Sequence, residues 1–140
     1  MLELRIIHPE FIIQSWGVLE PLVTKVAPYC EDYTVEQAKL MMATGRWKTY
    51  VVVNPEQEAT PVGFFTVSYD TQPNDCIAHV VLSAGKGYYT KEVAKLLQKE
   101  LKYQGATKVQ CNARPSVARL LQRVGFEPVT TIMRMVDDHE

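Results

Sequence analysis

The spacing of hydrophobic and polar positions changes several times along the N-terminal third of the chain, and each change predicts a new element. Residues 2–7 are mostly apolar and end at His8-Pro9, which is typical of a short strand. Apolar residues then recur at steps of three and four from Glu10 to Val26, which predicts a helix with one buried stripe. A second helix is expected to begin after an N-cap at Thr34 and to end at Gly45.

The middle of the chain has the pattern of strands. Residues 50–53, 61–70 and 76–82 are rich in β-branched and aromatic residues, and turn-forming segments separate them. Short connections favour antiparallel neighbours, so these three strands are expected to form a meander.

The last third of the chain alternates helix and strand. A helix is expected over residues 90–103, a strand over 108–111, a helix opened by Pro115, and a closing strand over 129–136. Because the helix at 90–103 crosses between two strands, those two strands should be parallel. The order β-α-α-β-β-β-α-β-α-β predicts one α/β (α+β) domain over residues 1–140, with a mixed central sheet of about six strands flanked by helices.

The composition is that of an ordinary globular domain and excludes some classes of function. With 15 basic and 16 acidic residues the formal net charge is −1, whereas an electrostatic nucleic-acid binder needs a surplus of Lys and Arg. No apolar stretch approaches the ~18 residues that span a bilayer, and the N-terminus does not read as a signal peptide. We therefore expect a cytoplasmic protein with no direct nucleic-acid or membrane contact.

The cysteines and histidines do not form a metal-binding pattern. Cys30, Cys76 and Cys111 lie far apart, are odd in number and show no Cys-x-x-Cys spacing. Reduced, mostly buried thiols are therefore expected. His8 and His139 are distant from every other potential ligand, so no metal site is expected.

Two stretches of the C-terminal half carry a family pattern. One is the strand that ends in Asn112, and the other is the helix of residues 116–124, which closes with Gly125-Phe126. Together with the order of elements, they resemble the GNAT superfamily of acetyl-CoA-dependent N-acetyltransferases over about residues 50–136.

In the GNAT family, a loop after the third central strand and the start of the following helix hold the pyrophosphate of coenzyme A. A helix start offers unpaired N–H groups and a positive dipole end to such an anion. The family writes this site as Val-x-Pro-x-x-(Arg/Gln)-Gly-x-Gly-x-(Gly/Ala). Aligned without gaps from Val81, this chain has Ser83 at the proline and Lys86-Gly87 at the Arg-Gly. A second register pairs Gly85 with Gly87 and lengthens the loop before the helix.

In the gapless register, Tyr89 and Lys91 stand at the two remaining glycine positions. Glu92 lies in the first turn of the helix and would repel a diphosphate, which Lys86 and Lys91 would partly offset. The resemblance implies that acetyl-CoA contacts come from Val81, Leu82, Ser83, Gly85, Lys86, Gly87, Tyr88, Tyr89, Thr90 and Asn112. The other interpretation is an ordinary strand-to-helix turn at residues 85–87 and a helix cap at Asn112.

Candidate catalytic residues follow from the same resemblance. His79 lies on the strand where GNAT enzymes sometimes place a general base, and a neutral imidazole could accept the ammonium proton. A hydrogen-bonded core histidine is the competing interpretation, and Asp75 is an alternative base. Tyr88 could protonate the leaving thiolate, although a tyrosine at a helix entrance more often packs. Leu121 stands where many family members carry a tyrosine that does so.

Four aromatic residues accompany the first two helices, which shape the acceptor pocket in GNAT enzymes. They either line such a pocket or belong to the core or a partner-facing stripe. They are Trp16, Tyr29, Tyr33 and Trp47.

The leading hypothesis is an N-acyltransferase that moves an acetyl group from acetyl-CoA to a small-molecule or protein amine by direct attack. The alternative is a catalytically silent GNAT-fold structural or interaction protein, such as a phage virion or accessory protein. Residues 113–116 (Ala-Arg-Pro-Ser) resemble the same segment of some phage-encoded GNAT-like proteins. That likeness suggests a phage origin, with the host cytoplasm or the virion as the location and a homo-oligomer or larger assembly as the state.

Overall fold

Helices and strands follow the predicted order up to the last element. The computed structural model describes residues 2–29, 32–56, 60–85, 90–113 and 115–136. In chain order the elements are β1 (Glu3–Ile7), the 3₁₀ turn η1 (Pro9–Phe11), α1 (Trp16–Val26), the 3₁₀ turn η2 (Ala27–Tyr29), α2 (Val35–Ala43), β2 (Lys48–Val53), β3 (Gly63–Thr71), β4 (Cys76–Gly85), α3 (Lys91–Tyr103), β5 (Lys108–Cys111) and α4 (Pro115–Gln122).

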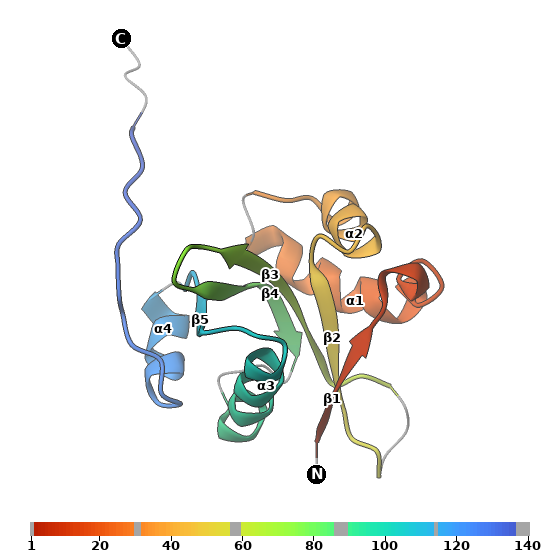
Figure 1. Ribbon diagram of the computed structural model, residues 1–140. Coiled ribbons are helices and arrows are strands. Elements are labelled where there is room, and N and C mark those ends of the chain that lie inside the picture. Colours follow the sequence, from red (N-terminus) through yellow and green to blue (C-terminus); the bar gives the residue numbers. More distant parts are fainter. Residues whose placement is uncertain (1, 30–31, 57–59, 86–89, 114, 137–140) are drawn as a thin grey trace.

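The strands form one mixed sheet in the order β1-β2-β3-β4-β5. The first four strands are antiparallel to their neighbours, and β5 runs parallel to β4. The predicted meander and the predicted parallel pair are therefore confirmed. Helices α1 and α2 cover one face of the sheet, and α3 and α4 cover the other (Figure 1).

The central strands are apolar on both faces because helices bury both faces. On β2, Val51 and Val53 pack with α1 and α2, whereas Tyr50 and Val52 pack with α3 and α4. This alternation is the period of two that a strand imposes on its side chains. It explains why the middle of the chain reads as nearly continuous apolar runs rather than as alternating ones.

The start of α2 is fixed by its own side chains. The Oγ1 atom of Thr34 accepts a hydrogen bond from the backbone N–H of Gln37 at 3.2 Å, and the side chain of Gln37 accepts one from the N–H of Thr34 at 2.9 Å. This reciprocal capping box satisfies two helix donors. The predicted N-cap at Thr34 is confirmed.

The first predicted helix begins later than the hydrophobic spacing indicated. Residues 10–15 precede α1, which starts at Trp16, and part of them lies in the 3₁₀ turn of η1. Pro9 stands at the start of that turn, where its fixed φ favours a tight turn. The apolar periodicity begins before α1 because Ile12, which follows η1, packs in the same core as Trp16.

The predicted closing strand is not formed, and the described part of the chain has five strands rather than about six. Residues 129–136, here called the tail, leave α4 as an extended segment outside the sheet (Figure 1). A strand requires a hydrogen-bonding neighbour as well as a suitable sequence. The residues have strand-forming side chains, but none of the sheet's described strands pairs with them.

Candidate functional site

The sheet opens between β4 and β5. The parallel pairing runs from Ile77 opposite Lys108 to Val80 opposite Cys111, where β5 ends. Strand β4 continues for five more residues to Gly85. Among the described strands, nothing lies beside this part of β4 on the side where β5 stood. The edge of β4 from Val81 to Ala84, here called the open edge, therefore has no neighbouring strand on this side within the described sheet, and such an edge can pair with a strand from outside.

A β-bulge lies at the start of the open edge. Thr66 pairs with Leu82 and Val67 pairs with Val80, so Val81 is an extra residue on β4. The bulge reverses which side chains face which helices. Ala78 and Val80 pack on the α3 side, whereas Leu82 and Ala84 pack on the α1 side. Bulges of this kind bend a strand and redirect its side chains, and they are frequent beside active sites.

The bulge is held by a buried hydroxyl. The backbone N–H of Leu82 donates a hydrogen bond to Oγ1 of Thr66 at 3.1 Å, and Thr66 is fully buried. A buried N–H without a partner costs free energy, so this contact compensates for the ladder bond that the irregular register removes. Thr66 thus stabilises the point at which β4 leaves β5.

His79 stands two residues before the bulge. Its neighbours Ala78 and Val80 face α3, so its half-buried imidazole lies on the α1 side of the sheet, the same side as Val81. Burial lowers the pKa of His79 below its ordinary value of about 6.5. The ring is therefore neutral at pH 7, which is the form that accepts a proton.

Stability is expected to depend on pH through His79. The unfolded chain takes up a proton near pH 6.5, whereas the folded protein takes it up only at lower pH, so the unfolded state binds more protons in that window. Folding stability should therefore fall as pH drops below about 6.5. The fall in melting temperature between pH 7.5 and pH 5.5 should be smaller for His79→Gln than for the wild type. An equal loss in both proteins would contradict the placement of this ring.

The alternative base, Asp75, serves a structural role at the opposite end of β4. Its carboxylate accepts hydrogen bonds from Lys108 Nζ at 3.0 Å and from Thr107 Oγ1 at 3.1 Å. The bond from Lys108 and that from Thr107 hold the pKa of Asp75 below its usual range. Val81 is six positions further along the chain, which is about 20 Å along a strand. Asp75 ties β5 to β4 and is too distant from the open edge to act there.

The predicted cofactor loop is described only at its two ends. Lys86, Gly87, Tyr88 and Tyr89 lie outside the described residues. Before them, Gly85 adopts φ +73° at the end of β4. After them, Thr90 caps α3, with its Oγ1 accepting a hydrogen bond from the N–H of Val93 at 3.4 Å.

The acidic residue in the first turn of α3 is engaged elsewhere. The Oε1 atom of Glu92 accepts a hydrogen bond from the backbone N–H of Leu2 at 2.9 Å. The carboxylate therefore points toward the start of β1, and the contact anchors α3 to the far edge of the sheet. Lys91, next to it, is exposed. The expected repulsion of an anion by Glu92 is reduced by this orientation.

Two described phenols share with Leu121 the side of the sheet that packs against α3. Leu121 is 3% exposed and packs in the core between the sheet, α3 and α4. Tyr50 and Tyr69 also lie on that side of the sheet, away from His79, and burial raises the pKa of both. Asn112 is exposed immediately after β5, beside the point where the two strands part.

The aromatic residues of the first two helices divide between core and surface. Trp16 and Trp47 are buried, at 8% and 2% exposure, so the core interpretation holds for both. Tyr33 is half-buried and meets Trp47 edge to face, with ring centroids 4.7 Å apart. The side chain of Tyr29 lies outside the described residues.

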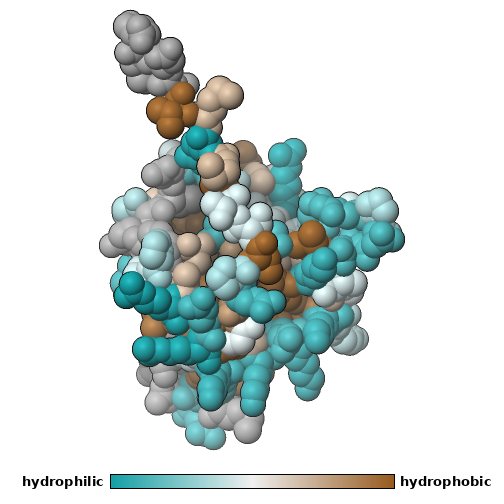
Figure 2. All heavy atoms as spheres, turned by 90° about the vertical axis from the view of Figure 1, so that its left-hand side faces the viewer, coloured by the Kyte–Doolittle hydropathy of each residue, from teal (hydrophilic) through white to brown (hydrophobic). Residues whose placement is uncertain are grey.

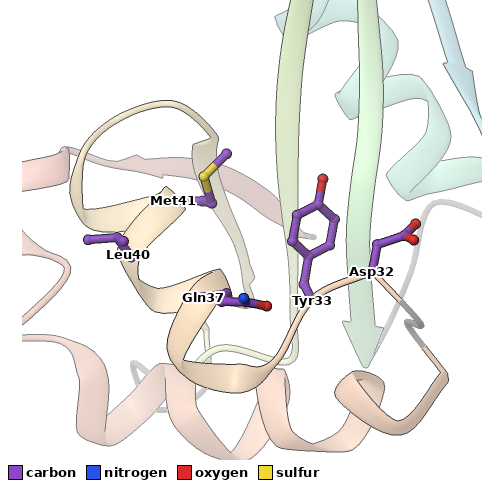
Figure 3. A pocket seen from close by; sticks show the side chains of 5 residues that line it. All are labelled: Asp32, Tyr33, Gln37, Leu40 and Met41. Carbon is purple, nitrogen blue, oxygen red and sulfur yellow. The ribbon is translucent and has the colours of Figure 1, made fainter.

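Tyr33 also lines a shallow pocket of about 220 Å³ at the entrance to α2. Asp32 and Tyr33 come from the segment that leads into the helix, and the other lining residues come from the helix itself (Figure 3). The lining is Asp32, Tyr33, Gln37, Leu40 and Met41. It combines one carboxylate with an aromatic ring and aliphatic side chains. The sequence did not indicate this pocket, because it depends on how the turn packs against the helix.

Within the described ranges, no group of three or more His, Cys, Asp or Glu side chains could hold a metal ion. The helices of those ranges are too short or too polar to cross a bilayer. Cys76 and Cys111 are half-buried, and neither is part of a disulfide bond.

No family model matches the chain, and no curated protein matches its sequence. Solved structures do resemble it along nearly their full length. A ribosomal-protein-alanine N-acetyltransferase from Brucella melitensis biovar Abortus 2308 is 13% identical, with 97% of this chain and 100% of that chain covered and a TM-score of 0.69. Glucosamine-6-phosphate N-acetyltransferase from Arabidopsis thaliana is 12% identical, with 99% of each chain covered and a TM-score of 0.63.

An aminoglycoside acetyltransferase from an uncultured soil metagenomic sample, in complex with sisomicin, is 14% identical. It covers 97% of each chain at a TM-score of 0.63. The TM-scores show that these proteins and this chain share a fold, and the identities are low enough that the likeness shows the fold alone. The chain has the GNAT fold of the N-acetyltransferases, as the sequence predicted.

Proposed function

We propose that this protein is an N-acyltransferase that uses acetyl-CoA and an amine. The observation that carries the proposal is the open edge: β4 runs past the end of β5 at a bulge, and backbone groups there lack a neighbouring strand in the described sheet. An extended ligand with amide groups, such as the pantetheine arm of acetyl-CoA, can pair with such an edge as a strand would. Its pyrophosphate would then lie near residues 85–90, at the start of α3.

In the proposed reaction, the amine nitrogen attacks the thioester carbonyl carbon. A C–N bond forms, the C–S bond breaks, and the electron pair leaves with the sulfur. His79, neutral at pH 7, accepts the proton that the amine loses, directly or through one water molecule. The protein's main contribution is to hold the two reactants together and to polarise the carbonyl. Tyr88 remains the candidate that protonates the thiolate.

The acceptor side would be the face that carries α1 and α2. His79 is on this face, and the pocket beside α2 offers Asp32, whose carboxylate attracts an ammonium group, next to the ring of Tyr33. The acceptors named for the similar structures are a protein alanine, an amino sugar phosphate and an aminoglycoside. They share only an amine, so the proposal commits to an amine acceptor and to no finer class.

One observation favours the second candidate, a silent GNAT-fold interaction protein. Leu121 occupies the position of the family's usual proton donor and is part of the core. A chain that had lost the reaction could keep the fold for contacts with other molecules. A phage origin and a location in the cytoplasm or a virion stay predictions.

Thiol release during acyl transfer tests the proposed function. Purified protein is incubated with acetyl-CoA and a panel of amines, namely an aminoglycoside, glucosamine-6-phosphate and a peptide with an N-terminal alanine. With an accepted amine, His79→Gln should lower kcat by about 10²-fold or more, the usual contribution of a general base. His8→Gln makes the same substitution at an exposed histidine and should leave kcat unchanged.

The His8→Gln variant separates an effect on catalysis from an effect on structure. Loss of rate in both histidine variants would point to a structural effect and would remove the role given to His79. Absence of thiol release with every amine, together with absence of acetyl-CoA binding, would favour the silent interaction protein.

A further inference from the structure

Basic residues are concentrated in the segment that holds α3, β5 and α4. Residues 91–123 carry eight Lys and Arg but only two acidic residues, whereas the rest of the chain carries seven basic and fourteen acidic ones. The net charge of −1, on which the expectation of no nucleic-acid contact rests, is an average over the whole chain and conceals this segregation. A strongly basic surface on an otherwise acidic protein attracts an anionic partner.

Four lysines form one stripe along α3. They follow one another at steps of four, four and three residues, which places them on one side of the helix. The opposite side carries the residues that are buried against the sheet. The stripe therefore points away from the sheet, and its residues are exposed. The four are Lys91, Lys95, Lys99 and Lys102.

Helix α4 adds two arginines on the same side of the molecule. Arg119 lies opposite the buried Leu121 on the helix, and Arg123 follows directly after its end. Because α3 and α4 cover the same face of the sheet, Arg119 and the lysine stripe point away from that sheet together (Figure 1). Both arginines are exposed, and within the described residues none of the six cations forms an ion pair. The six, here called the basic face, are Lys91, Lys95, Lys99, Lys102, Arg119 and Arg123.

The two acidic residues of the same segment are engaged away from the basic face. The carboxylate of Glu92 accepts the hydrogen bond from the N–H of Leu2, at the start of β1. Glu100 is half-buried three residues after the buried Leu97, and its Oε1 atom accepts a hydrogen bond from Gln104 Nε2 at 3.0 Å. The positive charge of the basic face is therefore not neutralised by the acids of its own segment.

The residue types on the basic face distinguish between classes of anionic partner. Interfaces between proteins are depleted of lysine and are built around buried apolar residues, whereas interfaces with nucleic acids are polar and strongly positive. The basic face is mostly lysine, and hydrophilic residues make up most of the surface on the side of α4 (Figure 2). Tyr103, one helical turn after Lys99, is 81% exposed. An exposed aromatic ring beside a row of cations is typical of sites on which the bases of a single strand stack.

We propose that the basic face binds the phosphate backbone of a single-stranded nucleic acid, without regard to its sequence, and that Tyr103 stacks on one of the bases. The stripe from Lys91 to Lys102 runs about 16 Å along α3. It therefore extends well beyond the start of α3, where the pyrophosphate of acetyl-CoA is proposed to lie. The contact does not depend on acyl transfer.

Fluorescence anisotropy of a labelled single strand of ~20 nucleotides, titrated with the full chain at several salt concentrations, tests this contact. With a phosphate at each of the six cations, the logarithm of the binding constant should fall with the logarithm of the salt concentration at a slope of about −4. Lys99→Glu with Lys102→Glu should weaken binding by at least ~10-fold at ~50 mM salt and should make the slope shallower.

A second double variant controls for the change in net charge. Lys25→Glu with Lys48→Glu alters the charge by the same amount at two exposed lysines outside the basic face. Because distant surface charges are screened by salt, its affinity should stay within ~2-fold of the wild type. Circular dichroism establishes that every variant is folded.

Tyr103→Ala distinguishes a nucleic acid from other polyanions. It should weaken binding of the single strand by at least ~5-fold without changing the salt slope, because stacking on a base is not ionic. Labelled poly-glutamate, which offers no base, should bind the wild type at least ~5-fold more weakly than the single strand does. Absence of binding by the wild type at ~50 mM salt and ~100 μM protein would overturn the proposal. So would equal losses in the two lysine variants, unchanged affinity in Tyr103→Ala, or poly-glutamate binding as tight as that of the single strand.

Discussion

Phe65→Ala is expected to lower the free energy of unfolding by about 3–5 kcal/mol. The ring of Phe65 is fully buried near the start of β3, in the core between the sheet and helices α3 and α4. Removing it takes away its transfer free energy and leaves a cavity that the neighbouring side chains fill only in part. Urea denaturation, monitored by circular dichroism, measures the loss.

Two further alanine variants serve as controls for Phe65→Ala. Phe64→Ala, one residue earlier, should cost a similar amount, because that ring is fully buried in the core on the opposite face of the sheet. Phe11→Ala should cost about 1 kcal/mol or less, because Phe11 is 45% exposed. A small effect at Phe65 or Phe64 would show that one face of the sheet is not covered as described.

The second large effect is expected at Gly85, at the end of β4. Its φ of +73° lies in the left-handed region, where a side chain costs about 1–2 kcal/mol. A Cβ atom there would also collide with the carbonyl oxygen of Val62 and come within 2.8 Å of the Cα of Gly63. Backbone cannot move aside cheaply, so Gly85→Ala should cost about 2–4 kcal/mol in total.

Gly105→Ala isolates the part of this cost that comes from the backbone angle. Gly105 has φ +100°, and apart from its own chain neighbours no atom lies within 4 Å of the position a Cβ would take. Gly105→Ala should be destabilised only by the conformational cost. The difference between the two variants in the free energy of unfolding therefore measures the close approach of β3 to the end of β4. Equal losses in urea denaturation would contradict that approach.

The sheet could be predicted from the sequence because its strands are marked by local composition. The β-branched run in β2 and the turn residues between β3 and β4 determine where the strands lie, and short loops determine that they are antiparallel. The bulge at Val81 could not be predicted, because it is a mismatch of one residue between two strands and leaves no local mark. The open edge depends on that bulge and on the shortness of β5, so local composition could not predict it either.

The tail has a strand-like sequence but does not pair with any of the described strands. Residues 129–136 have a clear strand composition, but a pattern along one chain does not reveal whether a neighbouring strand is present. In the candidate site, His79 and Leu121 were placed on the correct elements by the sequence. Their surroundings, a half-buried ring facing α1 and a leucine in the core facing α3, depend on contacts between distant segments.

Thermal unfolding of the full chain with and without acetyl-CoA measures whether the folded protein binds this co-substrate. At 100 times the dissociation constant, a ligand that binds only the folded state stabilises it by about 2.7 kcal/mol. For a protein of this size the melting temperature should rise by several degrees, and acetate at the same concentration should leave it unchanged. No rise at millimolar acetyl-CoA would contradict the assignment of the open edge of β4 as an acyl-CoA site.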